Sequence, residues 1–94
     1  MDIVFTFRST RDAIGGEKSL LDNRLPVSIM PLPSQLGAGC GLCLRVAEAD
    51  LSAARRLLAA ARVAPEGVYS RRQVEDEVIY APLPPTAPTN SIKT

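Results

Sequence analysis

The chain contains two cysteines, Cys40 and Cys43, three positions apart in the segment 37–45 (GAGCGLCLR). Gly39 and Gly41 flank Cys40, so its thiol is sterically open and the backbone can adopt conformations that other residues avoid. A cysteine thiolate is a nucleophile and can carry a transferred atom. The chain contains no histidine, which excludes Cys-His and Ser-His dyads and every His-dependent metal site. The sequence therefore predicts Cys40 as a nucleophile or carrier thiol that works without an imidazole.

The spacing of the two cysteines leaves their relationship open. If residues 41–44 are extended, the two side chains point to opposite faces, with Cα atoms about 10 Å apart. A disulfide needs Cα atoms within about 7 Å, so a bridge requires a turn, which the glycines permit. The plain alternatives are a small apolar side chain in a sheet for Cys43 and an incidental loop cysteine for Cys40.

A resident metal or cofactor is not expected. The CxxC segment supplies two of the four ligands of a structural zinc site, and the sequence has neither a second such pair nor a histidine. A site shared across a dimer, or a two-coordinate soft metal, stays as an alternative.

Composition predicts one small globular domain. The chain has 94 residues, of which 46% are hydrophobic and 22% charged, with a formal net charge of +1. This charge excludes a strongly basic nucleic-acid-binding protein. There is no apolar run of about 20 residues and no signal-peptide pattern, so no membrane association is expected. Two cysteines are too few for a disulfide scaffold, and we expect a reduced, cytoplasmic location.

The hydrophobic pattern predicts the order β-α-β-β-α-β. Alternating apolar residues indicate strands at 3–7, 27–30, 41–47 and 67–71, and helical spacing indicates helices from Ser9 or Thr10 to about Asp22 and from Asp50 to Arg62. This order predicts an α+β, ferredoxin-like sandwich, in which a four-stranded antiparallel sheet carries both helices on one face. The predicted organisation is a domain at 1–72, an edge segment of uncertain structure at 73–81 and a Pro-rich flexible tail at 82–94.

The predicted fold assigns side chains to the two faces of the sheet. The helix residues predicted to point inward are Ala13, Ile14, Leu20, Leu21, Leu51, Ala54, Leu57, Leu58 and Ala61. The residues predicted on the open face are Val4, Thr6, Ser28, Met30, Cys43 and Arg45. Because this face is partly apolar, a homodimer through it is an alternative that the sequence leaves open.

The predicted topology also places Cys40. In such a sheet the first and third strands are neighbours, so Cys40 is expected beside the start of the first helix, near Ser9 and Thr10. Either residue is a natural N-cap. A helix N-terminus and nearby cations favour a thiolate over a thiol. The residues predicted to stabilise the anion are Arg8, Ser9, Thr10, Arg11, Gly41 and Arg45.

Several short motifs occur together in order along residues 1–70. They are Phe5-Thr6-Phe7 leading into Ser9-Thr10, Pro31-Leu32-Pro33, Cys40-Gly41-Leu42 followed by Leu44-Arg45, and Gly67-Val68-Tyr69. With these motifs the chain resembles the selenium/sulfur (Se/S) carrier protein-like family, formerly a domain of unknown function.

The resemblance implies a compact α/β domain whose Cys-Gly motif carries or relays sulfur or selenium. Cys40 matches the motif cysteine, and Gly41 and Arg45 match its companions. Cys43 falls where relatives often have another small residue.

The resulting hypothesis is a non-enzymatic thiol carrier. Cys40 would accept sulfur or selenium from a donor protein and pass it to an acceptor, and Cys43 would discharge it by forming a disulfide with Cys40. The first alternative is an interaction or accessory module that binds a larger enzyme through the sheet face or the tail. The second is a dithiol redox protein in which both cysteines cycle between thiol and disulfide.

Overall fold

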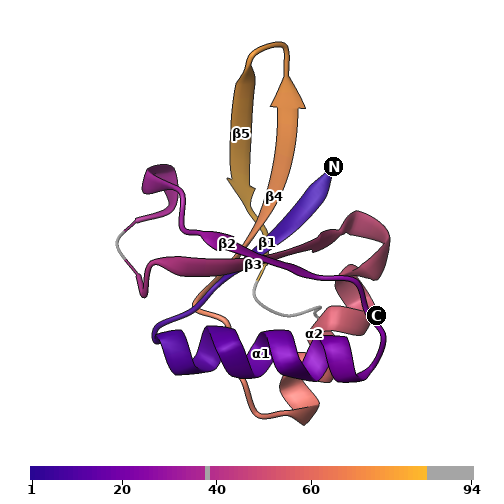
Figure 1. The fold of residues 1–94 in the computed structure, drawn as a ribbon. Coiled ribbons are helices and arrows are strands. Elements are labelled where there is room, and N and C mark those ends of the chain that lie inside the picture. The colour runs from indigo at the N-terminus through magenta and orange to yellow at the C-terminus, as the bar shows by residue number, and fades with distance from the viewer. Residues whose placement is uncertain (38, 85–94) are drawn as a thin grey trace, which may run out of the picture.

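A five-stranded antiparallel sheet and two helices form the fold in the computed structural model, which describes residues 1–37 and 39–84. The strands are β1 (Asp2–Thr6), β2 (Ser28–Pro31), β3 (Leu42–Ala47), β4 (Gly67–Val74) and β5 (Glu77–Pro82). The helices are α1 (Thr10–Asp22) and α2 (Leu51–Ala60), with single 3₁₀ turns η1 (Ser34–Leu36) and η2 (Glu48–Asp50). Figure 1 shows both helices on one side of the sheet and the β4–β5 hairpin rising on the other. Neither described helix combines the length and apolarity needed to cross a membrane.

The strand order is β2-β3-β1-β4-β5. The prediction of an α+β chain with an antiparallel sheet is confirmed, and β1 lies beside β3 as expected. The prediction of four strands is wrong, because residues 77–82 form a fifth strand that pairs with β4. A tight turn joins the two strands, and Glu75 adopts the left-handed conformation there with φ 57°. Of the predicted tail, residues 85–94 lie outside the described part of the chain.

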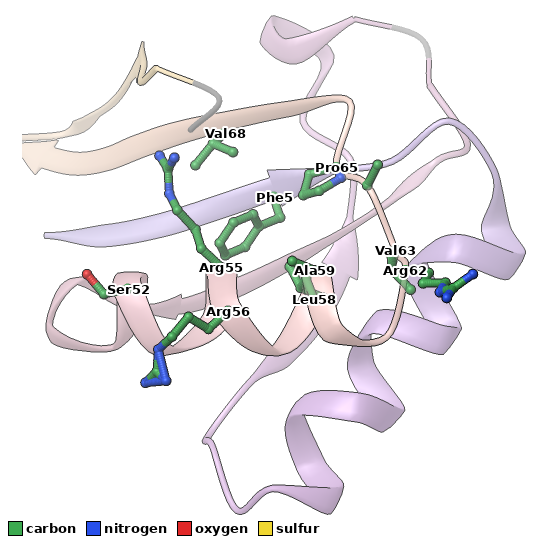
Figure 2. Close-up of a pocket in the computed structure, with 11 residues that line it drawn as sticks. Phe5, Ser52, Arg55, Arg56, Leu58, Ala59, Arg62, Val63, Pro65 and Val68 are labelled. Atoms are coloured by element: carbon green, nitrogen blue, oxygen red, sulfur yellow. The ribbon is translucent and has the colours of Figure 1, made fainter. Parts of the chain in front are cut away.

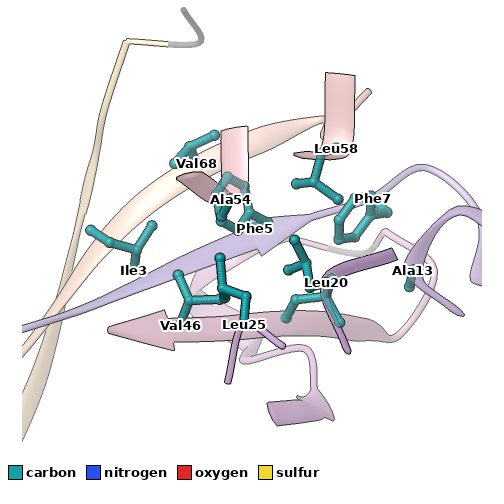
Figure 3. Close-up of a cluster of buried hydrophobic side chains, with 11 residues drawn as sticks. Ile3, Phe5, Phe7, Ala13, Leu20, Leu25, Val46, Ala54, Leu58 and Val68 are labelled. Atoms are coloured by element: carbon teal, nitrogen blue, oxygen red, sulfur yellow. The ribbon is translucent and has the colours of Figure 1, made fainter. Parts of the chain in front are cut away.

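The core lies between the sheet and the two helices (Figure 3). Its largest fully buried side chains are Ile3, Phe5, Phe7, Leu20, Leu44 and Leu58. Alternate residues of β1 and β3 point into this layer, as the two-residue period of a strand requires.

Two predictions of inward-pointing residues on α1 are wrong. Ile14 and Leu21 are each 52% exposed, whereas Ala13, Gly16 and Leu20 are buried. The buried residues Ala13, Gly16 and Leu20 are three and four positions apart, which is the spacing of one side of a helix. Ile14 and Leu21 each come directly after a buried residue, so their side chains point away from that side. A Cβ on Gly16 would lie 3.1 Å from Leu58 Cδ2, so the missing side chain lets α1 approach α2 and the sheet closely.

The second helix is shorter than predicted. It ends at Ala60 rather than Arg62, which adopts a left-handed conformation with φ 61°. Ala61 is consequently exposed instead of inward-pointing. Asp50 precedes the helix but makes no side-chain capping hydrogen bond.

The face of the sheet opposite the helices is less open than predicted. Val4, Thr6 and Cys43 are buried there. All three lie on β1 and β3, and each of these strands has a neighbouring strand on both sides. Cys43 lies in register between Thr6 and Met30, and Val4 lies beside Tyr69, so side chains of the neighbouring strands cover them. Of the six residues predicted on this face, those that keep exposed surface are Ser28, Met30 and Arg45.

Candidate functional site

The loop that holds Cys40 lies against the start of α1. The hydroxyl of Thr10 donates a hydrogen bond of 3.5 Å to the Cys40 carbonyl oxygen. On the other side of the cysteine, the backbone N–H of Leu32 donates to the Gly41 carbonyl oxygen at 2.9 Å. Because β1 and β3 are neighbours, the end of β1, the start of α1 and the start of β3 meet at one edge of the sheet. The predicted position of Cys40 beside Thr10 is confirmed.

The two glycines around Cys40 have different structural roles. Gly41 has φ +87°, a conformation that side-chain-bearing residues rarely adopt. Gly39 is restricted by space instead, because a Cβ there would lie 3.1 Å from the carbonyl oxygen of Phe7. A side chain at position 39 would therefore require the cysteine loop or the end of β1 to shift by a few tenths of an ångström.

The Cys40 side chain is partly buried and is a free thiol. It packs against the core cluster on the helix side of the sheet. Its Sγ lies 3.4 Å from the carbonyl oxygen of Leu42. Cys40 is thus held in place by its surroundings while it keeps solvent access.

Cys43 has a different environment. It is a free, fully buried thiol on the face of β3 that it shares with Arg45, and its Sγ lies 3.7 Å from the carbonyl oxygen of Pro31. Burial, with a smaller effect of Cys40, raises the pKa of Cys43 to about 11, and Arg45 opposes this only in part. At neutral pH Cys43 is therefore a protonated thiol.

The residues predicted to stabilise an anion are spread over both faces. Ser9 is the N-cap of α1, and its Oγ accepts a 3.1 Å hydrogen bond from the Asp12 N–H. Arg8 comes directly before Ser9, Arg11 comes directly after Thr10, and both arginine side chains are exposed. Arg45, by contrast, has its Nε 3.4 Å from the carboxylate of Asp2. Arg45 therefore lies beside Cys43 in the sheet, and the cations nearest in sequence to the α1 cap are Arg8 and Arg11.

The structure adds a neighbour of this loop that no sequence pattern indicated. The Glu66 N–H donates to the Thr6 carbonyl oxygen at 2.7 Å, next to the end of β1. Its carboxylate oxygen Oε1 lies 3.7 Å from the position that a Cβ on Gly39 would occupy.

Within residues 1–37 and 39–84, no group of three or more His, Cys, Asp or Glu side chains gathers as metal ligands would.

A separate cavity lies between α2 and the strands β1 and β4 (Figure 2). It has a volume of about 640 Å³ and does not include either cysteine in its lining. The helical spacing of apolar residues predicts the part of the lining that α2 contributes. The rest of the lining, including residues 62–65 and Val68, lies beside α2 only in the folded chain, so no local pattern predicts the cavity.

Comparison with known families places the site in context. The model of the family described as "Putative Se/S carrier protein-like" matches residues 2–70, which include β1 to α2, both cysteines and the first part of β4. No curated protein and no solved structure was found to match the chain. The matched segment covers more than half of the 94 residues and contains the whole cysteine loop with the helix start against which it packs. The chain belongs to the "Putative Se/S carrier protein-like" family.

Proposed function

We propose that this protein carries a sulfur or selenium atom on Cys40, which it receives from a donor protein and passes to an acceptor. The observation that carries the proposal is the position of Cys40: its thiol is partly buried, lies between two glycines and is anchored at the start of α1 through the Thr10 hydroxyl. Membership of the carrier-like family supports the kind of cargo. In this account the protein is a carrier rather than an enzyme.

The loading step is a transfer between two sulfur atoms. The Cys40 thiolate attacks the outer sulfur of a persulfide on the donor, R–S–SH. The donor's S–S bond breaks, its thiolate R–S⁻ leaves, and Cys40 becomes Cys40–S–SH. One neutral sulfur atom and no net electrons change hands, so the step needs no oxidant or reductant. An acceptor thiolate reverses the chemistry and regenerates the Cys40 thiolate.

The surroundings of Cys40 support an anionic intermediate. The first N–H groups of a helix lack intrahelical partners and carry partial positive charge, so they favour a nearby anion. Ser9 uses one of these groups, that of Asp12, for the cap. Arg8 and Arg11 add exposed positive charge to the same end of α1. We assign these residues to the stabilisation of the Cys40 thiolate and of its persulfide.

The proposal does not require Cys43. An attack of Cys43 on the loaded Cys40 would form a disulfide and release HS⁻, but burial raises the pKa of Cys43 to about 11, so its thiol is protonated at pH 7. Cys40 contacts the core cluster on the helix side of the sheet, whereas the side chain of Cys43 lies on the opposite face. A dithiol redox cycle is therefore less well supported than transfer through Cys40 alone.

Matched cysteine variants test the proposal. The wild type, Cys40→Ser and Cys43→Ser are incubated separately with a small persulfide donor and with its selenium analogue, and intact mass is measured. We expect the wild type and Cys43→Ser to gain the mass of one sulfur or selenium atom and Cys40→Ser to gain none. Loading of Cys40→Ser at the wild-type level would overturn the proposal. Loss of loading in Cys43→Ser, with its fold intact by circular dichroism, would favour the dithiol alternative.

A further inference from the structure

The cavity beside α2 combines an apolar floor with arginine side chains. Its floor is formed by Phe5, Leu58 and Val68, each less than 5% exposed. Small and apolar residues of α2 and the following loop, Ala59 and Val63 among them, complete the wall. A volume of about 640 Å³ falls within the roughly 300–1,000 Å³ of typical small-molecule sites. The space can therefore accommodate the body of a small apolar ligand.

Three arginines line this cavity and no acidic residue does, among the described residues that form it. They are Arg55, Arg56 and Arg62, and none of the three forms an ion pair within residues 1–37 and 39–84. Figure 2 shows Arg55 reaching from α2 toward β4, with Arg56 and Arg62 extending outward from the helix and from its end. The cavity lining is therefore positively charged, and this charge attracts an anion.

One arginine is already positioned by the fold. The Nη2 of Arg55 donates a 2.7 Å hydrogen bond to the carbonyl oxygen of Pro84, next to Leu83, which packs against the core. This bond uses one of the five N–H donors of the guanidinium group. The remaining donors can bind a carboxylate at the mouth of the cavity.

We infer that this cavity binds a small amphipathic anion, with its apolar body against Val63 and Val68 and its carboxylate at Arg55. This site is separate from the Cys40 loop and its use does not depend on the proposed carrier function. The charge of the lining determines the class of ligand. Because the described lining residues include three arginines and no acidic residue, an anionic head group is favoured over a cationic one.

The test uses the full chain and two probes with the same alkyl chain and opposite charge, sodium decanoate and decyltrimethylammonium, both below their micelle concentrations. Methyl resonances are followed by NMR during each titration. We expect saturable decanoate shifts centred on Leu58, Val63 and Val68, and an affinity for decanoate at least about tenfold higher than for the cationic probe. Shifts that do not saturate, or equal affinity for the two probes, would overturn the inference.

Matched variants locate the binding site. Ala59→Phe places a ring in the cavity from an exposed position of α2, whereas Ala60→Phe places the same ring on an exposed neighbour that does not line it. We expect Ala59→Phe to weaken decanoate binding by about tenfold or more and Ala60→Phe to leave it within about twofold. Unchanged binding in Ala59→Phe would show that decanoate binds elsewhere.

The arginines are tested separately from the apolar floor. Arg55→Gln with Arg56→Gln should remove most of the preference for decanoate over the cationic probe. The control, Arg24→Gln with Arg72→Gln, changes the net charge equally at exposed positions outside the cavity. If both double variants lowered the preference for decanoate equally, the preference would come from the net charge of the whole protein. That result would contradict the placement of the carboxylate at the cavity.

Discussion

The hydroxyl of Thr10 lies 3.5 Å from the carbonyl oxygen of Cys40, thirty residues further along the chain. This contact joins the first residue of α1 to the cysteine loop before β3. It is the direct evidence that the sheet topology brings the cysteine to a helix N-terminus.

Removing this contact should have a small effect on stability. Thr10→Val keeps the β-branched shape and loses only the hydroxyl, whose hydrogen bond is long and exposed. We expect a loss of about 0.5 kcal/mol in the free energy of unfolding, against about 1 kcal/mol for Ser9→Ala, which removes the N-cap. Urea denaturation checks both values. A larger loss for Thr10→Val than for Ser9→Ala would contradict the assignment of Ser9 as the cap.

Two adjacent glycines of α1 should respond in opposite ways. A Cβ on Gly15 would have only Val63 Cγ2 nearby, at 4.0 Å, so Gly15→Ala should stabilise the protein by up to about 1 kcal/mol through helix propensity. A Cβ on Gly16 would lie 3.1 Å from Leu58 Cδ2 and 3.2 Å from Leu44 Cδ1. Gly16→Ala should therefore be less stable than Gly15→Ala by about 1–2 kcal/mol in the same denaturation assay. Equal stability would show that α1 does not pack as described.

The glycine before the cysteine should affect loading of Cys40. Gly39→Ala would place a Cβ 3.1 Å from the Phe7 carbonyl oxygen, and because that atom is backbone, the cysteine loop itself must shift. We expect a several-fold slower gain of sulfur by Cys40, measured by intact mass over time. The control is Gly37→Ala: Gly37 has φ +99° and open space around it, so this variant should lose about 1 kcal/mol of stability without slowing loading. Equal loading rates in the two variants would contradict a role for the loop position.

Cys43 should contribute to the pH dependence of stability. Its pKa is raised from 9.0 to about 11 in the folded protein, mainly by burial. Between these values the unfolded chain releases the Cys43 proton while the folded protein retains it, so the free energy of unfolding falls as the pH rises from about 9 to about 11. Cys43→Ala should lose less stability than the wild type over this range. Parallel pH profiles from denaturation at each pH would show that the thiol is not buried.

Sequence patterns predicted much of the framework because hydrophobic alternation and helix-capping signals are local. The start of α1 at Thr10 follows from Ser9, and the neighbouring positions of β1 and β3 follow from the order of elements. The sequence leaves the fifth strand undecided, as part of the edge segment 73–81, because three consecutive acidic residues, Glu75 to Glu77, suggest a surface segment. Strand β5 lies at the edge of the sheet and needs little apolar character.

The candidate site was predicted only where topology determines it. The place of Cys40 beside Thr10 follows from the strand order. The burial of Cys43 depends on the side chains of neighbouring strands, and the contact of Arg45 with Asp2 depends on a cross-strand register. Such contacts join distant segments and leave no local pattern in the sequence.

The most direct test of the central claim is to locate the transferred atom in the wild-type chain. After incubation with a persulfide donor, free thiols and persulfides are trapped by alkylation, and peptides that separate Cys40 from Cys43 are analysed by tandem mass spectrometry. We predict that the additional sulfur is on Cys40, while Cys43 carries at most the alkylating group. An additional sulfur found on Cys43, or a Cys40–Cys43 disulfide as the main product, would contradict it.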